Sequence, residues 1–190
     1  MKKIKSLFKR NYGEGQRLVY NEVVEGSEWV LNDEGVPTRK YDGTCCAIIN
    51  GELYKRYDAK AGKKAPEGAI PCQEPDPITG HHPHWVKCVE SKPEDKYFFE
   101  GFRTFAKEVN GEIWDGTFEL CGEKINGNPE HITGHTLIPH GQTILLDVPL
   151  TFEGLKEYLK DKDIEGIVWH RKDGSGDMVK IKKKDFWGKR

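Results

Sequence analysis

Residues 45–57 read CCAIINGELYKRY, and this stretch predicts a β-hairpin. Two runs of apolar and aromatic residues flank the dipeptide Asn50-Gly51. Asn and Gly both tolerate the left-handed backbone of a two-residue hairpin turn, so an Asn-Gly pair between two such runs is a strong hairpin signal. We therefore expect two antiparallel strands here, and with them a sheet-based fold.

Helical spacing appears in two places further along the chain. The side chains of Phe98, Phe102, Phe105 and Val109 recur on one helical face, after residues 91–94, which have the Ser-x-x-Glu form of a capping box. A second helix is expected over residues 151–160, with Thr151 as its N-cap.

Strand-like runs outnumber these helices. They lie at residues 17–20, 29–31, 117–121, 143–148, 164–170 and 177–182. Residues 60–88 hold many Gly and Pro and predict a long surface loop. The pattern indicates an α+β protein with mostly antiparallel sheets flanked by helices.

Composition narrows the class of protein. The chain has 190 residues, of which 36% are hydrophobic and 32% charged, and a formal net charge of −1. These values suit one domain with a well-hydrated surface, and no apolar run is long enough to span a membrane. The basic N-terminal segment, residues 1–10, lacks the apolar region of a signal peptide. Five cysteines show no disulfide-like framework, so we expect reduced thiols in an intracellular, cytoplasmic protein.

The segment most indicative of chemistry is Lys40-Tyr41-Asp42-Gly43-Thr44, just before the hairpin. A lysine that acts as a nucleophile at neutral pH must lose its proton, and burial or nearby positive charge favours that loss. Gly43 permits a tight turn and a close approach to a ligand, and Asp42 can tie the turn to its own backbone. Alone, such a short motif is a weak signal.

Further charged residues follow in a fixed order. Arg56 lies on the second hairpin strand, where it would be close to Lys40, and Glu119 lies on an expected strand. Glu165 precedes an apolar strand, and Lys180 and Lys182 alternate on another, so that both amines point to one face. Two carboxylates, a cationic face and an isolated lysine could bind a nucleoside triphosphate with a divalent metal.

This ordered set resembles the signature of the covalent nucleotidyltransferases, which include DNA ligases, RNA ligases and mRNA capping enzymes. The resemblance runs from Lys40 to Lys182. The run KYDGTCC at residues 40–46 is most similar to small ATP-dependent RNA ligases, as is Pro139-His140-Gly141. Cys45 stands where DNA ligases carry an arginine, and the chain ends eight residues past Lys182. The resemblance implies a single adenylylation (nucleotidyltransferase) domain over residues 1–190, without an OB-fold domain.

The resemblance also implies a role for each motif residue. Lys40 would form a phosphoramide with AMP, and Glu165 would support the metal, directly or through water. Lys180 and Lys182 would hold the α-phosphate. The remaining implied nucleotide contacts are Arg56 to the ribose or phosphate and to the 5′-phosphate end, Glu119 to a ribose hydroxyl, Thr38 and Arg39 to the adenine edge, and Ile167 to the adenine face.

The implied cofactors are ATP and Mg²⁺ or Mn²⁺, and the implied partner is RNA with 5′-phosphate and 3′-hydroxyl ends. Two alternatives stay open. The chain could be another transferase of this superfamily, such as a DNA ligase or a GTP-using capping enzyme, or a non-catalytic nucleotide- or RNA-binding domain. The sequence does not specify an oligomeric state.

Each motif also has a purely structural interpretation. Lys180 and Lys182 could mark a solvated edge strand, and Glu119 and Glu165 could be surface carboxylates. His81, His82 and His84 with Cys88 could suggest zinc, but their spacing fits no closed four-ligand site and their Pro-rich surroundings indicate an exposed loop.

Overall fold

A computed structural model describes residues 1–13, 15 and 17–190. The chain divides into two compact units. The six-stranded unit comprises residues 1–3 and 42–140, and the four-stranded unit comprises residues 4–41 and 141–190. Each contains its own sheet and its own hydrophobic core. The single adenylylation domain expected over residues 1–190 stays a prediction.

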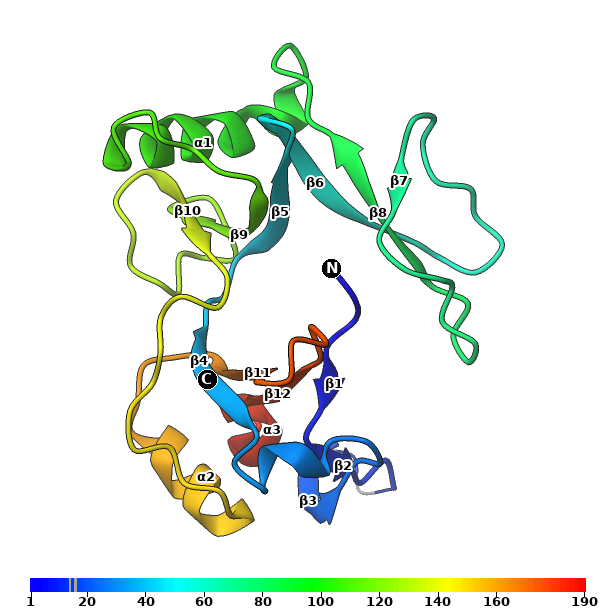
Figure 1. Cartoon of the computed structure of the whole chain (residues 1–190), viewed down its shortest axis with the longest axis vertical. Helices are drawn as coiled ribbons and strands as arrows, with labels where there is room; N and C mark the ends of the chain where they lie inside the picture. Colours follow the sequence, from blue (N-terminus) through cyan, green and yellow to red (C-terminus); the bar gives the residue numbers. More distant parts are fainter. Residues whose placement is uncertain (14, 16) are drawn as a thin grey trace. The chain divides into compact units, whose positions relative to one another are not determined.

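The six-stranded unit is an antiparallel sheet with one long helix. Its strand order is β10-β9-β5-β6-β8-β7. The bounds are β5 (Thr44–Ile49), β6 (Glu52–Ala59), β7 (Ile70–Pro71), β8 (His82–Lys87), β9 (Gly116–Gly122) and β10 (His135–Pro139). Helix α1 (Lys96–Glu108) packs against this sheet (Figure 1), where Phe105 contacts Phe118 at 5.0 Å between ring centroids.

The predicted hairpin is confirmed in its position and its turn. Ile49 of β5 pairs with Glu52 of β6, so that Asn50 and Gly51 form a two-residue connection. Both residues have positive φ, 51° and 75°, as a turn of this kind requires. The Asp115 carboxylate accepts hydrogen bonds from both turn amides, at 2.6 and 3.0 Å, which fixes the hairpin against β9.

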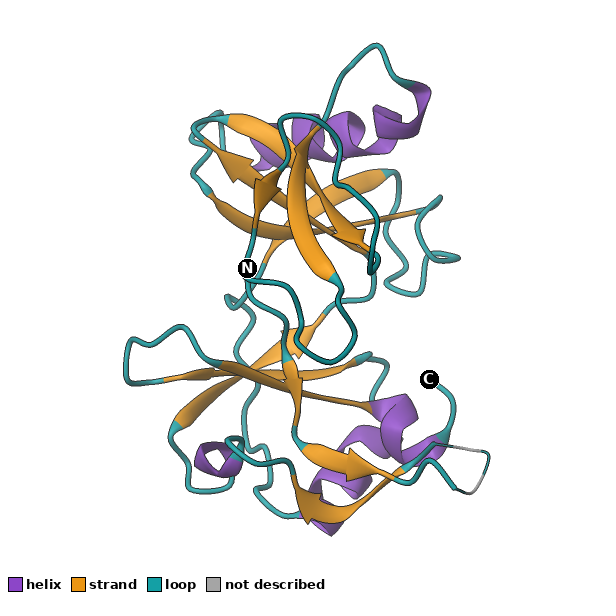
Figure 2. Ribbon diagram, turned by 90° about the vertical axis from the view of Figure 1, so that its right-hand side faces the viewer, coloured by secondary structure: helices purple, strands orange, loops and turns teal. Residues whose placement is uncertain are grey.

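The four-stranded unit has a smaller sheet, ordered β1-β12-β11-β4. The bounds are β1 (Lys5–Ser6), β4 (Gly35–Lys40), β11 (Gly166–Arg171) and β12 (Met178–Lys182), with a separate pair β2 (Phe8–Arg10) and β3 (Val19–Val23). Helices α2 (Phe152–Lys160) and α3 (Lys183–Trp187) lie on the same side of the sheet (Figure 2), because their buried residues share one core with Ile167, Trp169 and Ile181.

The predicted α+β class with mostly antiparallel sheets is confirmed. The helix expected at 151–160 is α2, and the Thr151 hydroxyl accepts a hydrogen bond from the Gly154 amide at 3.1 Å as its N-cap. The expected strands at 117–121, 164–170 and 177–182 correspond to β9, β11 and β12. None of the helices among the described residues is long and apolar enough to cross a membrane.

Three local predictions of strands and loops are wrong. Residues 29–31 overlap the 3₁₀ turn η1 (Glu28–Val30), which buries Trp29 and Val30 without extending the chain. Residues 143–148 form no regular strand; the backbone of 143–145 follows the edge of β4 through an isolated bridge and two hydrogen bonds. The expected loop over residues 60–88 ends early, because β8 pairs along β6.

The expected capping box at residues 91–94 does not form. Pro93 begins a 3₁₀ turn, η2 (Pro93–Asp95), that leads into α1, and no side chain caps either start. The Asp95 carboxylate, fully buried, instead pairs with Lys55 and accepts a hydrogen bond from the Val89 amide. Long-range pairing of this buried charge outweighs local capping.

Candidate functional site

Sheet register in the four-stranded unit aligns the predicted lysines. Gly166 of β11 lies opposite Lys40 of β4 on one side and opposite Lys182 of β12 on the other. Residues directly opposite in an antiparallel ladder project to the same face. Two positions further along, Lys180 occupies the same face. The sheet therefore gathers three lysines that are far apart in the sequence.

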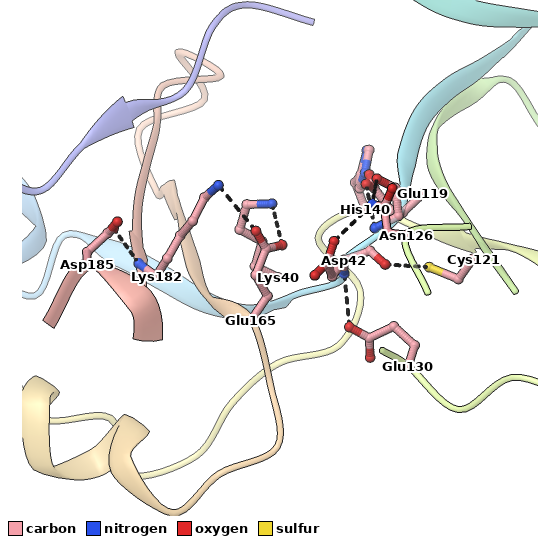
Figure 3. Close-up of polar contacts among 11 residues, drawn as sticks. Lys40, Asp42, Glu119, Cys121, Asn126, Glu130, His140, Glu165, Lys182 and Asp185 are labelled. Carbon is pink, nitrogen blue, oxygen red and sulfur yellow. Dashed lines mark hydrogen bonds and ion pairs between the residues drawn. The ribbon is translucent and has the colours of Figure 1, made fainter. Parts of the chain in front are cut away.

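Glu165 lies just before β11 and pairs with two of these lysines. Its Oε2 accepts a hydrogen bond from Lys40 Nζ at 2.8 Å, and its Oε1 lies 3.2 Å from Lys182 Nζ (Figure 3). The side chain of Glu165 is 11% exposed, so these ion pairs are shielded from bulk water. Gly166 is needed beside it, since a Cβ there would lie 2.1 Å from the carbonyl oxygen of Ile181.

The same contacts test whether Glu165 suits a metal ion. A carboxylate is the ligand that Mg²⁺ prefers, and Glu165 lies beside the amine expected to react. Both of its oxygens are engaged by lysines. It can therefore join a metal shell when Lys40 loses its charge or Lys182 turns to a phosphate.

Lys180 is the most electrostatically perturbed member of the group. Burial, and after it the positive charges of Lys182 and Lys40, lower its pKa to about 8, against smaller opposing effects of Asp185 and Glu165. A half-buried lysine beside other cations indicates a face with positive potential. Such a face favours an anionic ligand.

The three residues predicted to contact adenine, Thr38, Arg39 and Ile167, lie in different surroundings. The Thr38 hydroxyl is buried and donates to the Val168 carbonyl at 2.8 Å. The Arg39 guanidinium lies 4.6 Å from the centre of the Tyr41 ring. Ile167 alternates to the opposite face of β11 from Gly166 and is fully buried in the core. Its side chain therefore cannot pack on a base that lies on the Lys40 face.

In the six-stranded unit, Gly43 is held against β9. Its amide donates to Glu119 Oε1 at 3.2 Å, and a Cβ at this position would lie 2.1 Å from the Leu120 carbonyl oxygen. The sequence suggested that Gly43 permits a close approach to a ligand, but in the structure Gly43 closely approaches strand β9. The Asn126 amide donates to Asp42 Oδ1 at 3.0 Å and to the Gly43 carbonyl at 2.9 Å. The Asp42 side chain therefore pairs with Asn126, where the sequence suggested a bond to its own backbone.

Glu119 also meets His140 and Cys45. His140 Nε2 lies 2.7 Å from Glu119 Oε2, and the other ring nitrogen lies 3.0 Å from the Thr117 hydroxyl. Cys45 is opposite Glu119 in the ladder of β5 and β9, and donor atoms of Cys45, Glu119 and His140 lie within 4.8 Å of one another. Sulfur, nitrogen and oxygen donors could hold Zn²⁺, but only if the thiol ionises. Burial and the charge of Glu119 raise the pKa of the Cys45 thiol to about 12.

Arg56 lies in β6 of the same unit. Its guanidinium donates to the Met1 carbonyl at 3.2 Å and lies 5.8 Å from the Trp85 ring centre. The structure therefore brings Lys40, Glu165, Lys180 and Lys182 together in the four-stranded unit. Arg56 and Glu119 belong to the six-stranded unit, and their nucleotide contacts stay predictions.

Some residues of these networks were not anticipated. Asn126 is followed by Gly127, a dipeptide that signals a turn but not the partner of its side chain. Asp185 accepts from the Lys182 amide at 2.8 Å and from Arg10 at 2.6 Å. Lys182-x-x-Asp185 is a spacing that helix capping could have suggested, whereas the pairing with Arg10 spans 175 residues and has no local signal.

Comparison with known proteins finds similarity to RNA ligases. A family model described as RNA ligase 1 matches residues 104–188. A protein named RNA ligase 1 from Pongo abelii is 28% identical over 218 residues, covering 77% of this chain and 65% of that protein. One of the same name from Danio rerio is 24% identical over 216 residues, covering 76% of this chain and 65% of that protein. The chain thus spans about two thirds of the length of these curated relatives.

A solved structure of an RNA ligase from Naegleria gruberi, a lysine-to-methionine mutant with AMP and Mn, also matches. The TM-score is 0.45 at 14% sequence identity, and the match covers 95% of this chain and 60% of that chain.

Proposed function

We propose a function for this chain on the premise that it falls within the RNA ligase nucleotidyltransferase family, which the family model and the curated relatives support. In this proposal, Lys40 takes AMP from ATP, and the chain then joins the 5′-phosphate and 3′-hydroxyl ends of RNA. One observation carries it: the Lys40 amine lies 2.8 Å from a largely buried carboxylate, on a sheet face shared with Lys180 and Lys182.

In the first step, Lys40 Nζ attacks the α-phosphorus of ATP. A P–N bond forms, the bond between the α-phosphorus and its bridging oxygen breaks, and pyrophosphate leaves. The amine must first lose a proton, and Glu165 Oε2 is within hydrogen-bond distance to take it. Lys180 and Lys182 stabilise the negative charge that develops on the phosphate oxygens.

The next two steps use RNA. A 5′-phosphate oxygen attacks the phosphorus of the lysyl-AMP, which forms an RNA-adenylate and releases the Lys40 amine. A 3′-hydroxyl then attacks the 5′-phosphate, the RNA ends are joined and AMP leaves. Mg²⁺ or Mn²⁺, when bound with the nucleotide, would supply further charge neutralisation, with Glu165 as its candidate ligand.

Intact-mass spectrometry after incubation with ATP and Mg²⁺ tests the first step. We expect a gain of one AMP, located on Lys40 by peptide mapping and absent in Lys40→Ala. Lys107→Ala is a matched control, because Lys107 is an exposed lysine on α1 of the other unit. Parallel reactions with GTP separate an ATP-using ligase from a capping enzyme, and chelation of the metal should abolish the gain.

An unchanged mass with every nucleotide would instead favour a non-catalytic binding domain. AMP found on another lysine, or retained in Lys40→Ala, would remove Lys40 from the mechanism.

The joining step needs its own assay. Adenylylated protein is mixed with labelled RNA that carries either a 5′-phosphate or a 5′-hydroxyl, and products are separated on a denaturing gel. We expect adenylated and joined RNA only from the 5′-phosphate substrate. Equal or better joining of nicked DNA would assign the chain to DNA ligation.

A further inference from the structure

A pocket of about 450 Å³ in the four-stranded unit contains five cationic side chains. They come from both ends of the sequence: Arg10, Arg17, Lys180, Lys182 and Lys184. We call this the cationic pocket. Lys180 and Lys182 have roles in the proposed AMP transfer, whereas Arg10, Arg17 and Lys184 have none, so the pocket extends beyond the reacting group.

The positive charge of this pocket is largely uncompensated. Among the described residues that line it, Asp185 supplies the one carboxylate, and Glu165, outside the lining, pairs with Lys182 at 3.2 Å. Five cations less these two anions leave an excess of three. The Asp185 carboxylate is 2% exposed and already engaged, by Arg10 at 2.6 Å and by the Lys182 amide at 2.8 Å. It holds the pocket together but cannot neutralise it.

Arg10 is positioned before any ligand arrives. One guanidinium nitrogen is paired with Asp185, and another donates to the Arg17 carbonyl at 3.2 Å. This contact joins the end of β2 to the segment before β3. A guanidinium held in this way loses little conformational freedom when it binds an oxyanion.

The lowered pKa of Lys180 indicates a positive electrostatic potential inside the pocket. Burial and the charges of Lys182 and Lys40 lower its pKa to about 8, although Asp185 and Glu165 act in the opposite direction. An anion beside Lys180 would relieve this repulsion. A negatively charged ligand would therefore stabilise the pocket.

We propose that the cationic pocket binds two linked phosphates, the β- and γ-phosphates of ATP, and so holds the pyrophosphate leaving group during transfer to Lys40. The assignment to ATP rests on the proposed function. The charge balance favours a polyphosphate over a single phosphate, because one phosphate carries about two negative charges at pH 7 and two linked phosphates carry about three to four. The position of the pocket also agrees with the β- and γ-phosphates, because Lys180 and Lys182, the proposed contacts of the α-phosphate, line it.

Direct binding of pyrophosphate, without nucleotide or RNA, tests the proposal by isothermal titration calorimetry. The key variant is Arg17→Ala with Lys184→Ala. Both side chains are exposed, so their removal should leave the fold intact, which thermal unfolding will check. Arg10 is kept, because its loss would leave Asp185 buried and unpaired. Each lost charged contact should weaken pyrophosphate binding about tenfold, so the double variant should lose about a hundredfold.

Lys107→Ala is the matched control, since it removes one exposed cation from the other unit and should leave the affinity for pyrophosphate unchanged. No measurable pyrophosphate binding by the unaltered chain, or equal affinity in the double variant, would overturn the proposal.

Two further arms distinguish the sources of phosphate. In AMP transfer, the double variant should raise the KM for ATP with a smaller effect on kcat. In binding to RNA, its preference for 5′-phosphate over 5′-hydroxyl ends should match that of the unaltered chain. A variant that loses this preference but keeps its pyrophosphate affinity would assign the pocket to the RNA end and overturn the polyphosphate proposal.

Failure of this inference is separable from failure of the proposed function. Pyrophosphate titration needs no chemistry at Lys40, and Lys40→Ala should still bind pyrophosphate. Normal AMP transfer with no effect of Arg17 or Lys184 on pyrophosphate would reject the pocket alone. Pyrophosphate binding without AMP transfer would reject the function alone.

Discussion

Lys180 shows, at the scale of one residue, how a binding face can reduce stability. Its pKa falls from the ordinary lysine value of 10.5 to about 8 in the folded chain, through burial and the charges of Lys182 and Lys40. Below pH 8 the folded chain therefore holds a charged lysine in an unfavourable place. Lys180→Met should raise the free energy of unfolding at pH 7 by about 1–3 kcal/mol, measured by urea denaturation.

The stability gained in Lys180→Met should depend on pH. Between about pH 8 and 10.5 the unfolded chain binds more protons at Lys180 than the folded chain, so the stability of the unaltered protein rises with pH. The advantage of the variant should shrink over the same range. A variant that is less stable at pH 7 would show that Asp185 and Glu165 already compensate the charge.

Glu165 is the residue on which the proposed chemistry can be tested most directly. Glu165→Gln keeps the shape of the side chain but removes the charge that pairs with Lys40 and Lys182. We expect the rate of AMP transfer, followed by single-turnover mass spectrometry, to fall about 10²–10³-fold. Glu153→Gln, an exposed carboxamide substitution on α2, should leave the rate unchanged. Equal rates for both variants would contradict a role for Glu165 in the transfer.

At the scale of elements, Gly43 lies just before β5 and is packed against the backbone of β9. A Cβ at Gly43 would lie 2.1 Å from the Leu120 carbonyl oxygen, so Gly43→Ala must push the two strands apart. We expect a loss of about 2–3 kcal/mol in the free energy of unfolding. Gly116→Ala is a matched strand control, because the nearest atoms there lie 3.8 Å away. Equal stability of the two variants would show that the strands can adjust.

Elements with local signals were predictable from the sequence. The Asn50-Gly51 turn fixed the β5–β6 hairpin, and Thr151 fixed the start of α2. The elements that were missed depend on distant partners: β8 is a strand because it pairs with β6, and β10 because it pairs with β9. Their Gly- and Pro-rich surroundings resemble loops until that pairing is known.

The same limit applies to the candidate site. The order of the motif residues indicated Lys40, Glu165, Lys180 and Lys182, and the sheet register of β4, β11 and β12 brings them together. Arg17 could not be assigned in this way, because it lies in no motif and tertiary folding alone places it beside Lys180. Ile167 matched its motif, but strand alternation turns it into the core.

At the scale of the whole molecule, two separate cores raise the question of whether the chain unfolds in one step. Phe118 is fully buried in the core of the six-stranded unit, and Leu155 is fully buried in the core of the four-stranded unit. Replacing either by Ala should destabilise its own core by about 3–5 kcal/mol. Because the cores share no residues, we expect the two losses to be local.

Native-state hydrogen exchange can separate the two cores. Phe118→Ala should speed amide exchange in β5 and β9 and leave β11 and β12 protected, whereas Leu155→Ala should do the reverse. The two variants serve as controls for each other, since each removes a fully buried side chain from one core. If either variant accelerated exchange equally in both units, the chain would unfold as one cooperative domain. Local losses would instead mean that the sheet with Lys40 can persist while the unit with Glu119 opens.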